Sequence, residues 1–196
     1  MDPTMWPFVR IAGGEDVAWD FARVKLGERR YLFFVVSARP YETSPIQQRL
    51  STDLATFGED LGPYASVVRT YPQRAEVQRD YFAGLGWPDS IAERVRDPGW
   101  VDPLMLVLDR EYSGFDPEQH QWAIVWLDDY NPETLYRVFS KLARLARDPK
   151  TDLIEYLRKA AAASRLKSVA RRLLGVFDIK PGLFGVSLNV NELLAP

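Results

Sequence analysis

The chain has 196 residues and a formal net charge of −2, and its 46% hydrophobic and 27% charged residues are ordinary for a globular protein of about one domain plus an appendage. It contains no cysteine, which excludes disulfide bonds, thiol nucleophiles and cysteine-ligated metal sites. No apolar run reaches the ~20 residues that span a bilayer, and residues 1–8 lack the pattern of a signal peptide. We therefore expect a cytoplasmic protein without a transmembrane segment.

Charge is distributed unevenly along the chain. Residues 150–196 contain eight Lys and Arg against four Asp and Glu, a net of +4, so the first 149 residues carry a net of −6. An acidic body with a basic tail is a real asymmetry, although it is too small to indicate nucleic-acid binding by itself.

The first part of the chain is predicted to form two strands around one helix. Phe8–Ala12 is a short apolar stretch closed by two glycines. Apolar residues at i, i+4 and i+7 predict a helix over Asp16–Leu26, which Gly27 can end. Tyr31–Val36 is continuously apolar, as is typical of a strand that is covered on both faces.

The clearest helix start follows a polar turn. Ser44 can cap the helix, Pro45 suits its first position, and Gln47 stands three residues after the cap, as in a capping box. Apolar residues then recur every three or four positions, at Ile46, Leu50, Leu54, Phe57 and Leu61. Gly62 ends this pattern, and Ala65–Thr70 is predicted to be the next short strand.

The middle of the chain predicts two helices and a hairpin. A helix over Arg74–Leu85 is followed by a short helix that Ser90 could start. Leu104–Leu108 and Trp122–Leu127 are apolar strands. The polar residues 109–121 between them predict an extended hairpin connection.

The last part predicts two helices and a strand. One helix starts at Pro132 after an Asn cap, and its apolar face contains Leu135, Val138, Phe139, Leu142 and Leu145. Lys150–Leu174 is a longer amphipathic helix, with Leu153, Leu157 and Ala160 near one face. Phe184–Asn191 alternates apolar and small polar residues, so we expect a half-buried strand that pairs with the sheet of its own chain or of another copy.

This order of elements through residue 147, three βα steps followed by a hairpin and a covering helix, resembles the thioredoxin fold over residues 6–147. Pro103, directly before the strand Leu104–Leu108, matches the position of the family's cis-proline, and the turn Tyr41–Pro45 matches the position of its redox motif. The resemblance implies an α/β fold with a mixed sheet flanked by helices over residues 1–149. Residues 150–196 would form a helix–strand extension for packing or assembly.

The chain departs from the family at the residues that carry its chemistry. Thioredoxins place two cysteines at a helix N-terminus, where free N–H groups and the helix dipole stabilise a thiolate. The matching residues here have no thiol, and no general base can be assigned to activate the serine: Tyr41, Glu42, Thr43 and Ser44. Disulfide exchange is therefore excluded, and Pro103 keeps only the implied role of presenting backbone to an extended ligand.

Other candidate chemistries have simpler structural explanations. His120, the only histidine, is either a general base or an exposed loop residue. Asp128 and Asp129 could bind a metal or serve only the electrostatics of the helix start that follows. The four residues Trp87, Trp100, Trp122 and Trp126 could line a ligand pocket or fill the core. We favour the structural alternative in each case and predict no metal, cofactor or catalytic residue.

The predicted C-terminal helix has a basic face. Its candidate binding residues are Arg158, Arg165, Arg171 and Arg172. Such a helix can bind a protein partner, an anionic membrane or nucleic acid, or it can pack on its own acidic body. The run Ala160–Ala163 would allow another helix to approach closely.

Taken together, the residues favour a non-catalytic module over an enzyme. We expect a redox-inactive protein-interaction or assembly module that uses the turn Tyr41–Ser44 with Pro103, the basic helix, or both, to bind a protein partner or to form a homo-oligomer. Two alternatives stay open. One is a thiol-independent enzyme of a thioredoxin-like branch, and the other is a peripheral membrane or nucleic-acid adaptor that acts through the basic helix.

Overall fold

The structure is a computed structural model of the whole chain. It describes residues 8–10, 26–36, 45–69, 82–97, 103–112, 114–127, 132–171, 185–189 and 193–194. The predicted helices Asp16–Leu26 and Arg74–Leu85 lie outside these ranges except for their last residues.

The described strands form one six-stranded sheet in the order β1-β3-β2-β4-β5-β6. Their bounds are Phe8–Arg10 (β1), Tyr31–Val36 (β2), Ala65–Arg69 (β3), Leu104–Leu108 (β4), Trp122–Trp126 (β5) and Gly185–Asn189 (β6). β3 pairs parallel with both β1 and β2, whereas β4 runs antiparallel to both β2 and β5. The sheet is therefore mixed, with a parallel half and an antiparallel hairpin.

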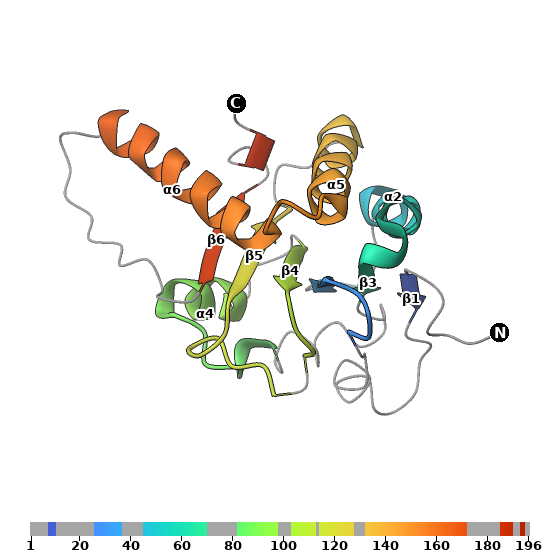
Figure 1. Cartoon of the computed structure of the whole chain (residues 1–196). Coiled ribbons are helices and arrows are strands. Elements are labelled where there is room, and N and C mark those ends of the chain that lie inside the picture. The colour runs from blue at the N-terminus through green and yellow to red at the C-terminus, as the bar shows by residue number, and fades with distance from the viewer. Residues whose placement is uncertain are drawn as a thin grey trace.

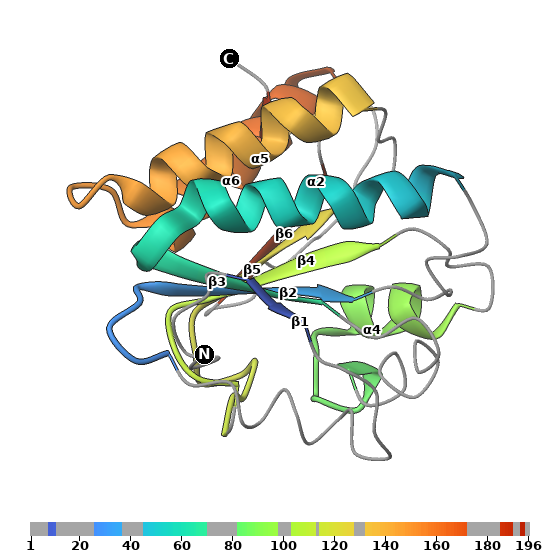
Figure 2. The same ribbon diagram turned by 90° about the vertical axis from the view of Figure 1, so that its right-hand side faces the viewer.

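Helices cover both faces of this sheet. α2 (Pro45–Leu61), α5 (Pro132–Arg147) and α6 (Leu153–Arg171) lie on one face, and α4 (Asp89–Arg96) lies on the other (Figures 1 and 2). A single 3₁₀ turn, η3 (Gly62–Tyr64), joins α2 to β3. The result is an α/β architecture of three layers.

The two faces of β2 pack into two separate cores. Tyr31, Phe33 and Val35 belong to the cluster under α2, α5 and α6, whereas the alternate side chains of β2 belong to the cluster under α4. All six residues of β2 are buried, because successive side chains of a strand point to opposite faces and helices cover both. This explains why the predicted strand Tyr31–Val36 is apolar throughout.

Several predicted boundaries are confirmed. β2 and β4 have the predicted bounds, and α2 begins at Pro45 and ends at Leu61. Gly62 follows the helix with φ +58°, a left-handed conformation that glycine adopts at little cost. The hairpin is confirmed as well, since Leu104 pairs with Trp126 and Leu108 with Trp122.

Two predicted helix starts are wrong. α4 begins at Asp89, so Ser90 lies inside the helix; Ile91 and Ala92 donate their N–H groups to the carbonyl of Pro88, which closes the first turn without a side-chain cap. α6 begins at Leu153 instead of Lys150. Asp152 caps it, because its Oδ1 accepts the N–H of Glu155 at 3.0 Å.

The C-terminal strand pairs within its own chain. β6 lies parallel to β5, with Gly185 opposite Trp122 and Asn189 opposite Trp126. Of the two pairings that the sequence left open, the structure shows the intramolecular one. The division into residues 1–149 and an extension of residues 150–196 stays a prediction.

Candidate functional site

The sequence placed a candidate site where β2 ends and α2 begins. Pro103 is buried directly before β4, and the pairing of Val36 with Leu104 puts it beside the end of β2. Tyr41, Glu42, Thr43 and Ser44 lie outside the described residues. α2 begins at Pro45, the residue directly after Ser44, so the helix starts where the sequence predicted it next to the candidate site.

Pro103 itself has little backbone to offer a ligand. Proline has no N–H to donate. Its carbonyl already accepts the N–H of Leu127 at 2.9 Å, which ties the start of β4 to the residue after β5. Backbone contacts to an extended ligand at this end of the sheet would therefore come from neighbouring residues.

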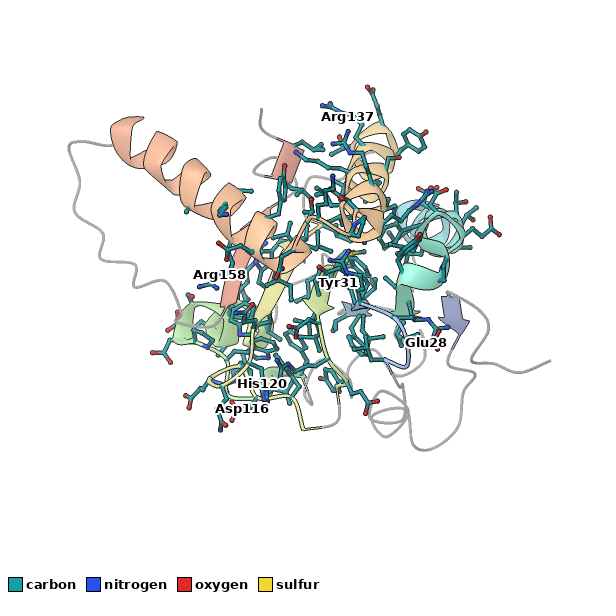
Figure 3. The ribbon with its side chains drawn as sticks, in the orientation of Figure 1. Glu28, Tyr31, Asp116, His120, Arg137 and Arg158 are labelled. Carbon is teal, nitrogen blue, oxygen red and sulfur yellow. The ribbon has the colours of Figure 1, made fainter. Side chains whose placement is uncertain are left out.

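The basic helix α6 is partly neutralised within its own first turns. Arg158 lies 3.7 Å and Lys159 3.5 Å from the carboxylate of Glu155. These are the i,i+3 and i,i+4 spacings at which side chains meet on a helix surface. Figure 3 labels Arg158 on this helix. The side chains of Arg165 and Arg171, and the whole of Arg172, lie outside the described residues.

Buried residues of α6 show that its opposite side belongs to the core. Leu153, Ile154, Leu157 and Ala161 are buried and join the cluster formed by β2, α2 and α5. Among the three alanines at positions 160–162, whose burial the structure describes, Ala161 is buried instead of the predicted Ala160, which is half-buried. The described part of this run thus packs partly on its own chain.

His120 helps to order the loop between β4 and β5. Its Nδ1 accepts the backbone N–H of Asp116 at 2.9 Å, and its ring stacks on Phe115 with centroids 6.1 Å apart. The carboxylate of Asp116 in turn accepts the Glu118 N–H and the Gln119 amide. His120 and Asp116 lie together in this loop in Figure 3. One ring nitrogen of His120 is thereby committed to structure.

The described tryptophans fill the core under α4. Trp87, Trp122 and Trp126 are at most 5% exposed, and the rings of Trp87 and Trp122 meet edge to face at 5.1 Å. Two of the indole N–H groups donate to backbone carbonyls, that of Trp87 to Phe82 O at 2.6 Å and that of Trp122 to Pro117 O at 3.0 Å. Packing therefore accounts for these three residues; Trp100 lies outside the described residues, as do Asp128 and Asp129.

At the other end of the sheet, where β2 begins, a hydrogen-bonded network connects β2 to the turn between α5 and α6. The guanidinium of Arg30 donates to the carbonyls of Asp148 at 2.7 Å and Thr151 at 2.8 Å. The Tyr31 hydroxyl accepts the N–H of Leu153 at 2.9 Å. Burial raises the pKa of the Tyr31 phenol above its ordinary value of 10.0, so the hydroxyl stays neutral at physiological pH.

The turn between α5 and α6 is held by Asp148. Its carboxylate accepts the Thr151 hydroxyl at 2.6 Å and the Lys150 N–H at 2.9 Å. Hydrogen bonds to an anion favour its charged form, and the Thr151 hydroxyl, followed by the Lys150 N–H, lowers the pKa of Asp148 from its ordinary 3.8.

A pocket of about 540 Å³ lies beside this turn, between the end of α2 and the second half of α5. Its lining comprises Asp60, Tyr64, Ser140, Ala143, Arg144, Arg147 and Asp148. Arg147 reaches across it, with Nη1 3.5 Å from the backbone oxygen of Asp60. The sequence pattern of α5 predicted its buried face but not this site. The arginines that recur on the side of α5 opposite its apolar residues could have indicated a polar site there.

Comparison of the chain with protein-family models, with curated proteins and with solved structures found no match to any of them. Within the described ranges, no three His, Asp or Glu side chains come together as a metal site. No described helix is long and apolar enough to cross a membrane.

Proposed function

We propose that this chain is a thioredoxin-like protein-interaction module without redox activity. The observation that carries the proposal is the pairing of β2, parallel to β3 on one side and antiparallel to β4 on the other. That pairing supports the order of βα steps and hairpin on which the resemblance rests. It also brings Pro103 beside Val36, the last residue of β2.

The absence of cysteine supports recognition over electron transfer at this end of the sheet. A residue at the start of a helix still meets free N–H groups, because the first four have no partner within the helix. Such groups can donate hydrogen bonds to carbonyl or carboxylate oxygens of a bound peptide without any covalent step. Tyr41, Glu42, Thr43 and Ser44 would supply the side chains of this recognition.

The contacts of three other residues support this proposal over its alternatives. An enzyme that used His120 as a base would have to work with one ring nitrogen engaged by Asp116. An adaptor that used α6 would find Arg158 and Lys159 already sharing Glu155. A homo-oligomer remains a form of the proposed module, with a second copy as the partner.

The test is a selection of peptides from a random display library on the full chain. We expect enriched peptides that lose binding to the double variant Thr43→Arg with Ser44→Arg. The matched control is Thr52→Arg with Thr56→Arg, which adds the same charge to exposed positions of α2 and should keep binding. Peptides that bind both variants equally, or a selection that enriches nothing, would contradict the proposal.

A further inference from the structure

The outer face of α5 concentrates positive charge in an acidic protein. α5 carries four basic residues and one acidic residue, a net of +3. The whole chain carries −2, so the remaining residues carry −5. A basic helix on an acidic body creates a local field that attracts anionic groups.

This charge faces away from the sheet. Polar residues recur at spacings of 4, 3, 4 and 3 along one side of the helix, at Glu133, Arg137, Ser140, Arg144 and Arg147. The buried residues Leu135, Val138 and Leu142 occupy the opposite side. Figure 3 shows Arg137 on the side of α5 turned away from the sheet. We call Tyr136, Arg137, Ser140, Arg144 and Arg147 the arginine face.

Within the described part of the chain, this face has few internal partners. Neither Arg137 nor Arg144 pairs there with a carboxylate, and Arg147 donates only to the backbone of Asp60. The remaining base of the helix, Lys141, points elsewhere, because its Nζ donates to the Leu193 carbonyl at 2.8 Å. No carboxylate of the described residues forms an ion pair with these three guanidinium groups, so they can attract an external anion.

Aromatic residues border the same surface. Tyr136 is 69% exposed and Tyr64 is 41% exposed, and they are the two large hydrophobic side chains left exposed in the described part of the chain. Tyr64 lines the pocket together with Arg144 and Arg147, and Tyr136 lies one helical turn before Ser140. Tyrosine and arginine are the residues that most often dominate protein interfaces.

We propose that the arginine face binds an acidic segment of a partner protein, with one Asp or Glu side chain seated in the pocket between Arg144 and Arg147. An arginine fork matches a carboxylate with two parallel hydrogen bonds. Arg137 and Arg147 are ten positions apart, or about 15 Å along the helix. That distance corresponds to about five residues of extended peptide, so a second carboxylate four or five residues away would reach Arg137.

The surrounding acids favour separate carboxylates over a polyphosphate. Asp60 and Asp148 line the pocket, and Glu133 stands at the other end of the face. Asp60 and Asp148 offset part of the charge of Arg144 and Arg147, so the pocket suits the single charge of one carboxylate better than the several charges of a phosphate chain. A peptide can also place neutral residues beside Glu133. A membrane is a poorer fit, since an interfacial helix must bury an apolar face in lipid and that of α5 is already inside the protein.

This surface is distinct from the one used by the proposed function. The pocket lies where β2 begins, beside the network of Arg30, and Pro103 lies where β2 ends. The two proposals therefore fail or succeed separately.

The test is fluorescence anisotropy with a labelled peptide of about twelve residues that contains several glutamates and one leucine. Its twin has glutamine in place of each glutamate. We expect the full chain to bind the glutamate peptide at low salt and to release it as the salt concentration rises to about 0.5 M. The glutamine twin should not bind. Arg137→Glu with Arg144→Glu should weaken binding at least about tenfold.

The matched control is Arg158→Glu with Lys159→Glu, which changes the net charge equally on another exposed helix and should alter affinity less than about twofold. Circular dichroism checks folding, and Arg137→Gln with Arg144→Gln provides a milder second variant. The proposal is overturned if the glutamate peptide does not bind, if the twin binds equally, or if both charge-reversed variants lose affinity equally. Tighter binding of a phosphorylated peptide or of an oligonucleotide on the same face would assign it to that ligand instead.

Discussion

At the scale of single residues, Arg30 and Tyr31 connect the start of β2 to the joint between two helices. The guanidinium of Arg30 donates to three carbonyls around this joint, those of Ala146, Asp148 and Thr151. The Tyr31 hydroxyl accepts the first N–H of α6, one of the donors that have no partner within a helix. Polar groups therefore hold together elements that lie more than a hundred residues apart.

Tyr31 makes stability depend on alkaline pH in a predictable direction. Because burial raises its pKa above 10.0, the folded state favours the neutral phenol, and this contribution is complete below pH 10 and is lost as pH rises through the folded pKa. We expect Tyr31→Phe to cost about 1 kcal/mol of unfolding free energy near pH 7, because Leu153 N–H loses its acceptor. Above pH 10 the variant should lose stability less steeply than the wild type.

Urea unfolding from pH 8 to 11 checks this expectation. Tyr136→Phe, at an exposed position of α5, is the matched control and should behave like the wild type. Parallel pH curves for wild type and Tyr31→Phe would refute the assignment of the alkaline loss to Tyr31.

At the scale of elements, α6 shows how a cap fixes a helix boundary. Asp152 accepts the N–H of Glu155, three residues on, and its carbonyl accepts the N–H of Tyr156. We expect Asp152→Ala to destabilise the protein by about 1 kcal/mol in urea unfolding, and Asp152→Asn to restore most of that loss, since both side chains serve as N-caps. Equal losses for the two variants would show that the negative charge matters and the cap does not.

Strand and helix bounds could be predicted where local signals agreed. Tyr31–Val36 is apolar on both faces, and Pro45 follows a serine, a residue type favoured at helix starts, so both elements appear where the sequence indicated them. Ser90 failed as a cap because Pro88 supplies the carbonyl that closes the first turn of α4. A local sequence pattern therefore predicts a helix start least well where two possible start signals lie close together.

At the scale of the whole molecule, the sites depend on contacts that a linear pattern does not contain. The resemblance to the thioredoxin fold suggested that Pro103 lies near the end of β2, whereas the predicted hairpin specified only that β4 pairs with β5. The pocket could not be predicted, because it brings together Tyr64 of η3 and Arg144 of α5, which are eighty positions apart in the sequence, where α2 and α5 lie side by side (Figure 2). Its lining comes from α2, η3, α5 and the turn after α5, and none of these segments indicates a pocket when it is considered alone.

The same reasoning predicts the effect of removing residues 150–196. Those residues supply Leu153, Ile154, Leu157 and Leu193 to the core that β2, α2 and α5 share. Each fully buried aliphatic side chain contributes about 1.5–3 kcal/mol, so their combined loss is comparable to the 5–15 kcal/mol that stabilise a typical domain. Removal of β6 also leaves the edge of β5 unpaired, which favours association.

We therefore expect residues 1–149 alone to lose cooperative unfolding and to bind a dye that reports exposed apolar surface. Calorimetry with light scattering measures both the transition and any aggregation. The control removes only residues 195 and 196, which lie outside the described core, and should unfold like the full chain. A sharp transition of residues 1–149 near that of the full chain would mean that α6 and β6 form an independent extension and not a part of the core.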